Sequence, residues 1–207
     1  MNAQLGLELN GEKVEKPIFV NKYGDNVWAL VKHIQHDLQY HFQIMPFPTK
    51  DDDIVIPSVW AGEAPARDNE DASIGSPPYV IVRHLDSDNG IYEGGARAEV
   101  ANIGFICAIN SQEAFDNPEL GYHYIANMNK WVFTFLNQNR VFVGDKKTSF
   151  KWAIDDKTPI RTVNGLPKDF GVYEAVGAQA FPNWTSLIRV TYIGVTQCLP
   201  LFIDEII

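Results

Sequence analysis

The sequence predicts an α+β fold in which an antiparallel or mixed β-sheet packs against two main α-helices. Two long segments carry apolar residues at steps of three and four, which is the spacing of one helix face. Shorter runs are rich in β-branched residues and are bounded by Gly, Asp, Asn or Pro. With 207 residues, 45% of them hydrophobic, the chain is long enough for a single compact domain spanning 1–207.

The first helix is predicted over residues 25–43, with Asp25 as its N-terminal cap. One face of this helix is apolar and is expected to face the core: Val27, Leu30, Val31, Ile34, Leu38 and Phe42. The opposite face is polar and is interpreted as solvated: Lys32, Gln35, His36 and Gln39.

The second helix is predicted over residues 117–137, because Asn117 is a favourable cap and Pro118 fits a first helical turn. Its apolar stripe is wide enough to lie on a sheet rather than only on another helix. The stripe consists of Leu120, Tyr124, Ile125, Met128, Trp131, Val132, Phe135 and Leu136.

Strands are predicted at 79–85, 98–110, 140–143, 150–154, 171–176 and 185–197. The pair Gly94-Gly95 favours a turn, so the first two strands are expected to form a hairpin. An acidic turn is predicted directly after the first strand, at Asp86, Asp88, Asn89 and Gly90.

Residues 45–78 are predicted to be a long proline-rich loop insertion, an extended arm with one short strand at 54–56. A loop of this length in a compact domain commonly serves an interaction. Its apolar residues gain nothing from full solvation, so we expect them to pack against something. The resulting candidates for partner contact are Val55, Ile56, Val59 and Trp60.

The formal net charge of −9 argues against direct DNA wrapping, because a duplex binder replaces counterions with Lys and Arg. A pore through which DNA slides is a different case, since an acidic wall prevents sticking.

Cys107 and Cys198 lie in apolar runs and are interpreted as buried free thiols. We expect a protein without a signal peptide or a membrane span, made in the cytosol.

Two groups of residues qualify as candidate metal ligands. His33, His36 and His41 lie beside Asp37 in the first helix, but the HExxH spacing is absent. The run His84, Asp86 and Asp88 follows a strand, without the glycine and glutamate of a calcium loop. We interpret the first group as solvated helix histidines and the second as the acidic turn.

Other catalytic motifs are missing from the sequence, including a nucleophile elbow, a phosphate-binding loop and a dinucleotide fingerprint. The sequence therefore predicts no catalytic residue, no cofactor and no metal. One enzymatic alternative stays open, a metal-dependent hydrolase that uses the group His33, His36 and Asp37 or the run His84, Asp86 and Asp88.

The order of several motifs resembles the tail terminator family of long-tailed bacteriophages, whose members are also called tail completion or neck proteins. The motifs are Pro78-Tyr79-Val80-Ile81-Val82-Arg83, Ile103-Gly104-Phe105-Ile106-Cys107, the helix at Gly121-Tyr122, and Phe181-Pro182-Asn183-Trp184 with a final strand. The resemblance covers about residues 25–43 and 78–197. The aromatic-Pro-x-Trp corner at 181–184, which leads into a long β-branched strand, itself indicates assembly, so Phe181 and Trp184 are further candidates for partner contact.

The resemblance implies a non-enzymatic virion structural protein of the tail or neck. Such a protein would close the head-proximal end of the tail tube as a six-membered ring and would receive the head-closure protein. DNA would pass through the lumen without specific binding, and no catalytic residue is carried over. A second alternative is another neck or tail-tube subunit, and a tube subunit should polymerise into long cylinders.

Overall fold

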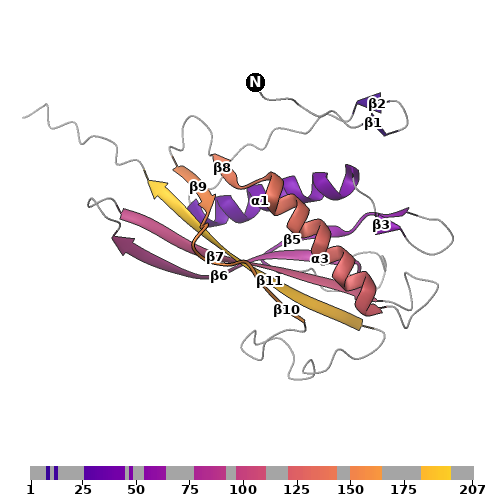
Figure 1. Ribbon diagram of the computed structural model, residues 1–207. Helices are drawn as coiled ribbons and strands as arrows, with labels where there is room; N and C mark the ends of the chain where they lie inside the picture. The colour runs from indigo at the N-terminus through magenta and orange to yellow at the C-terminus, as the bar shows by residue number, and fades with distance from the viewer. Residues whose placement is uncertain are drawn as a thin grey trace, which may run out of the picture.

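The computed structural model describes residues 8–9, 12–13, 26–44, 47–48, 54–63, 77–91, 97–110, 121–143, 150–164 and 183–196. Within them a seven-stranded sheet is covered by two helices, α1 (Asn26–Ile44) and α3 (Gly121–Gln138), which lie on the same face (Figure 1). The predicted α+β fold is confirmed. The sheet strands are β5 (Ser58–Ala61), β6 (Tyr79–Ile91), β7 (Arg97–Asn110), β8 (Val141–Val143), β9 (Phe150–Ile154), β10 (Arg161–Asn164) and β11 (Asn183–Thr196).

The strand order in the sheet is β5-β6-β7-β11-β9-β8, with β10 also paired to β11. The β5–β6 pair is parallel and the other pairs are antiparallel, so the sheet is mixed. Strands β9 and β10 follow one another along the same side of β11. Two short antiparallel pairs complete the described strands: β1 (Glu8–Leu9) with β2 (Glu12–Lys13), and β3 (Phe47–Pro48) with β4 (Ile54–Val55).

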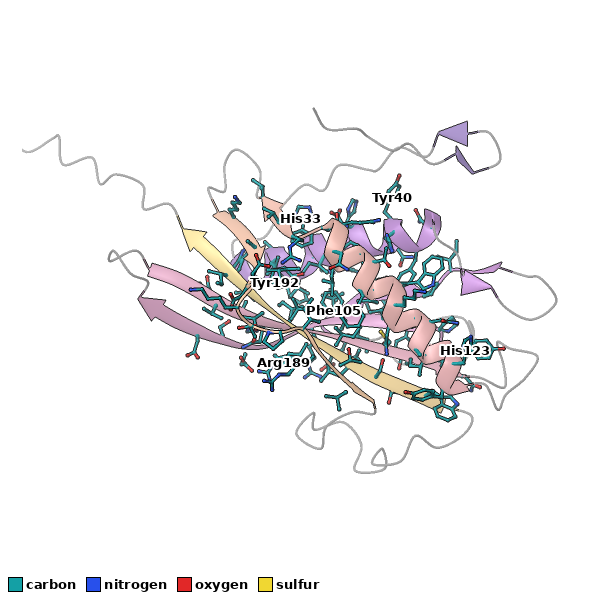
Figure 2. All side chains as sticks on the ribbon, in the orientation of Figure 1. His33, Tyr40, Phe105, His123, Arg189 and Tyr192 are labelled. Carbon is teal, nitrogen blue, oxygen red and sulfur yellow. The ribbon has the colours of Figure 1, made fainter. Side chains whose placement is uncertain are left out.

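Both helices are close to their predicted positions. Helix α1 is shifted by one residue at each end, and α3 is described from Gly121, while residues 117–120 of the predicted helix lie outside the described residues. Their apolar stripes meet the sheet in one hydrophobic core (Figure 2). Its largest fully buried side chains are Trp152, Tyr192, Phe42, Phe105 and Phe135.

The predicted antiparallel pairing of β6 and β7 is confirmed, whereas the predicted turn at Gly94-Gly95 lies outside the described residues. The acidic turn predicted directly after residue 85 is wrong. Strand β6 continues to Ile91, and Asp86 and Asp88 pair with Asn102 and Val100 of β7. The acidic residues are tolerated in the strand because their side chains are exposed there, and cross-strand partners satisfy Asp86.

The insertion at 45–78 contributes a strand to the sheet that the sequence did not predict. Strand β5 pairs with the start of β6, and the predicted strand at 54–56 is observed as β4. Strand β10 was also not predicted. The strands predicted at 140–143, 150–154 and 185–197 correspond to β8, β9 and β11, whereas 171–176 lies outside the described residues.

Helix α3 is tied to β11 by close packing and by one buried hydrogen bond. The Ser186 hydroxyl donates to Asn129 Oδ1 at 2.6 Å, and both residues are buried. At the start of the helix, Gly121 lies against the indole of Trp184, where an added methyl group would overlap the ring. These contacts fix the position of α3 along the final strand.

Candidate interaction surfaces

The first candidate metal group is partly assembled on α1. Asp37, only 5% exposed, lies between two histidines: its Oδ2 is 3.6 Å from His33 Nε2 and its Oδ1 is 3.0 Å from His36 Nδ1. These contacts bring together one carboxylate and two imidazoles. Within the part of the chain that the structure describes, no group of three or more His, Cys, Asp or Glu side chains is arranged to hold a metal ion.

His41, the third histidine of this helix, is a core residue. It is 4% exposed, and its ring packs edge-on against Trp131 and Phe135 of α3 at centroid distances of 6.5 and 5.6 Å. Burial lowers the pKa of His41, and a hydrogen bond to the Trp131 backbone opposes this effect in part. His41 Nε2 has no hydrogen-bond partner among the described residues. The interpretation of His41 as solvated is therefore wrong.

The second candidate group, the run from His84 to Asp88, is split by a β-bulge. The register shifts between His84 and Asp86, so that His84 lies opposite Ile103 and Asp86 lies opposite Asn102. Because Ile103 points into the core and its neighbour Asn102 points away from it, His84 and Asp86 lie on opposite faces of the sheet. His84 Nε2 is instead 2.6 Å from the Ser87 hydroxyl.

Asp86 is the centre of a polar network on the sheet face opposite α1 and α3, here called the open face. Asn102 Nδ2 donates to Asp86 Oδ1, and Arg189 Nη2 donates to Asp86 Oδ2 at 2.8 Å. Thr191 in turn donates to Asn102 Oδ1 at 2.7 Å. The network crosses β6, β7 and β11, and it fixes the Arg189 guanidinium, which lies on the side of the sheet away from the helices (Figure 2).

The candidate contact residues differ in their environment. Ile56 is 46% exposed, whereas Val59 is 4% exposed and belongs to the hydrophobic core. Trp60 is half-buried, and its indole Nε1 has no hydrogen-bond partner among the described residues. Trp184 is also half-buried and packs on α3. The side chains of Val55 and Phe181 lie outside the described residues.

The outer edge of β5 is closed by two glutamines of α1. Gln39 Oε1 accepts a hydrogen bond from Val59 N at 2.8 Å, and its Nε2 donates to Pro57 O at 3.2 Å. Gln35 Nε2 donates to Val59 O at 2.9 Å. The interpretation of Gln35 and Gln39 as solvated is therefore wrong: both are half-buried and bond the backbone that a further strand would use.

The other sheet edges carry exposed valines, which the sequence does not predict. Val141 and Val143 of β8 are 46% and 60% exposed, and Val163 of β10 is 47% exposed. Among the described strands, β8 pairs only with β9, and β10 pairs only with β11. Three-residue and four-residue strands carry too little periodicity to predict which side chains reach the surface.

Cys107 is a buried residue of β7, as predicted. Burial raises the pKa of its thiol to about 12, although a hydrogen bond with Ser186 opposes the shift. The second cysteine, Cys198, lies outside the described residues. The Cys107 thiol is therefore protonated at neutral pH and is a packing element rather than a nucleophile.

Comparison of the sequence with protein-family models and with curated proteins found no match to either. No helix in the described ranges combines the length and the hydrophobicity that crossing a bilayer requires.

Proposed function

We propose that this protein is a non-enzymatic structural subunit that assembles into a homo-oligomeric ring, a tail terminator at the head-proximal end of a phage tail tube. The sequence resemblance supplies the family, the expected sixfold ring and the virion location. Its neighbours would be the tail-tube protein below and the head-closure protein above, with DNA in the lumen.

The proposed assembly is supported by a difference between the edges of the sheet. The β5 edge is occupied by Gln35 and Gln39, whereas β8 and β10 present exposed valines. A closed ring needs two different surfaces on each subunit, since its contacts are heterologous. Apolar side chains on strands without a further partner are suited to one of these surfaces.

The charge supports a lumen that does not retain DNA. Each subunit carries a formal net charge of −9, so a ring of several copies is strongly acidic. An acidic wall repels phosphates and lets DNA pass.

The virion role is tested by sequencing several kilobases of DNA on either side of the gene. The proposal predicts neighbouring genes for capsid, connector and tail-tube proteins. A location among metabolic genes would remove the phage assignment. A tail-tube subunit would share such a neighbourhood, but the purified protein would then form long cylinders instead of closed rings.

A further inference from the structure

The open face carries two arginines directly opposite one another. The register of β10 and β11 pairs Arg161 with Arg189, and both side chains are exposed. Directly opposed residues of an antiparallel pair have Cα atoms about 4.5 to 5.5 Å apart and side chains on the same face. Like charges in this arrangement repel each other, and Asp86 offsets this repulsion only on the Arg189 side.

Only one of these arginines has a carboxylate partner within the described residues. Arg189 is bonded to Asp86, which Asn102 holds in place from the neighbouring strand. No described carboxylate forms an ion pair with Arg161, and Arg83 of the same cross-strand row pairs with Glu63 at 3.9 Å. The arginine pair therefore presents more N–H donors than the described residues use.

The surroundings of the pair are those of a protein interface. Val163 lies two residues after Arg161 on the same face, is 47% exposed and pairs with Leu187. The outer side of β10 bonds no other described strand. An exposed apolar side chain beside two guanidinium groups matches the enrichment of Arg at interfaces, where it binds carboxylates in a bidentate manner.

We propose that the surface formed by Arg161, Arg189 and Val163 is the docking site for acidic side chains of a second copy of this chain. Charge complementarity selects this occupant: a copy has 26 acidic and 17 basic residues, so its carboxylates outnumber its cationic side chains. The inference rests on the proposed ring and names one of its contact surfaces. A single carboxylate between the two guanidinium groups relieves their repulsion.

A nucleic acid fits this surface less well. Asp86 and Asp88, two residues apart on β6, lie on the open face, and Glu63 is near Arg83. These carboxylates would repel a continuous row of phosphates, which needs several cations along its path. A side-chain carboxylate occupies a single point, so it needs only Arg161 and the Arg189 N–H groups that Asp86 does not use.

The test compares three charge reversals in the full-length protein: Arg161→Glu, Arg189→Glu and, as a control, Lys130→Glu. Lys130 is exposed on α3, away from the open face, and its reversal changes the net charge by the same amount. Oligomer mass is measured by sedimentation and native mass spectrometry over a concentration series. The same proteins are titrated with a fluorescent DNA duplex. Circular dichroism and the melting temperature report the fold.

We expect each arginine reversal to weaken association by at least about tenfold, while Lys130→Glu associates like the natural chain. Arg161→Glu places a carboxylate opposite Arg189, so its melting temperature should be unchanged or higher even as assembly is lost. Weaker association at an unchanged or higher melting temperature would show that the variant has lost the contact and not the fold.

Three results would overturn the inference. If the natural chain forms rings and both arginine variants form them equally well, this surface is not the contact and the proposed ring stands. If the natural chain is monomeric at every concentration, the ring and the contact fail together. Arginine-dependent binding of DNA without self-association would assign the surface to phosphates instead.

Discussion

At the scale of single residues, Gln35 and Gln39 take the place of a neighbouring strand. Their amides bond Val59 on both its N–H and its C=O, which are the groups that an edge strand leaves open. Polar residues on one helix face have the same sequence pattern whether they meet water or a strand. The sequence therefore could not distinguish these two environments.

Replacing Gln39 with Ala should lower the free energy of unfolding by about 1 to 3 kcal/mol, because Val59 N and Pro57 O lose the amide that bonds them. Gln43→Ala is the matched control, since Gln43 is exposed on the same helix. Urea unfolding followed by circular dichroism measures both. Equal effects of the two substitutions would contradict the role of Gln39.

His41 makes the stability of the core depend on pH. Burial holds its pKa in the folded protein below the ordinary value of 6.5, so the unfolded chain binds the proton more readily. The neutral His41 therefore stabilises the folded protein fully at pH values above 6.5. This stabilisation is lost as the pH falls from 6.5 through the pKa of His41 in the folded protein.

The urea midpoint of the natural protein should accordingly be lower at acidic pH than at neutral pH, and His41→Phe should reduce the difference. Phenylalanine suits the aromatic surroundings formed by Trp131 and Phe135. His123→Phe, at an exposed position of α3, should leave the difference unchanged. A pH dependence that survives His41→Phe in full would assign the effect to other groups.

At the scale of elements, the contact between α3 and β11 depends on the absence of a side chain at Gly121. Gly121→Ala should lower the free energy of unfolding by about 1 to 3 kcal/mol through overlap with the Trp184 indole. Alanine has a higher helix propensity than glycine, so helix propensity alone would make this variant more stable. A loss of stability would therefore come from the packing against Trp184. The change is measured by thermal or urea unfolding.

A double-mutant cycle with Trp184→Leu isolates this contact. The smaller side chain makes room for the methyl group, so the double variant should be less destabilised than the sum of the single variants. Strictly additive effects would show that Gly121 and Trp184 do not pack against each other as described.

Long periodic elements were predictable from the sequence, and shorter or irregular features were not. Both helices follow from their repeating apolar residues, and strands β6 and β7 follow from their β-branched runs, which the core requires. Strands β5 and β10 have four residues each, too few for a period. The bulge after His84 changes which face Asp86 occupies, and a bulge has no reliable composition signal.

The same limit applies to the candidate surfaces. Ile56 and Val59 are both apolar residues of the same segment, but Ile56 is exposed and Val59 is buried. Composition identifies apolar residues but not the neighbours that cover them. The pairing of Arg161 with Arg189 depends on the register of two strands, which the sequence does not reveal.

At the scale of the whole molecule, the two sides of the sheet have different roles. The helices bury one face, and the other face carries the polar network around Asp86 and the opposed arginines Arg161 and Arg189. One edge is closed by α1, and other edges expose valines. Together with the acidic charge, these features support an assembly subunit.

We propose that this chain closes into a ring by itself. The most direct test is native mass spectrometry of the purified full-length protein over a concentration series, with electron microscopy of the same samples. The account predicts one discrete closed ring, expected to contain six copies, with a central opening. A monomer at every concentration, or open cylinders of variable length, would contradict it.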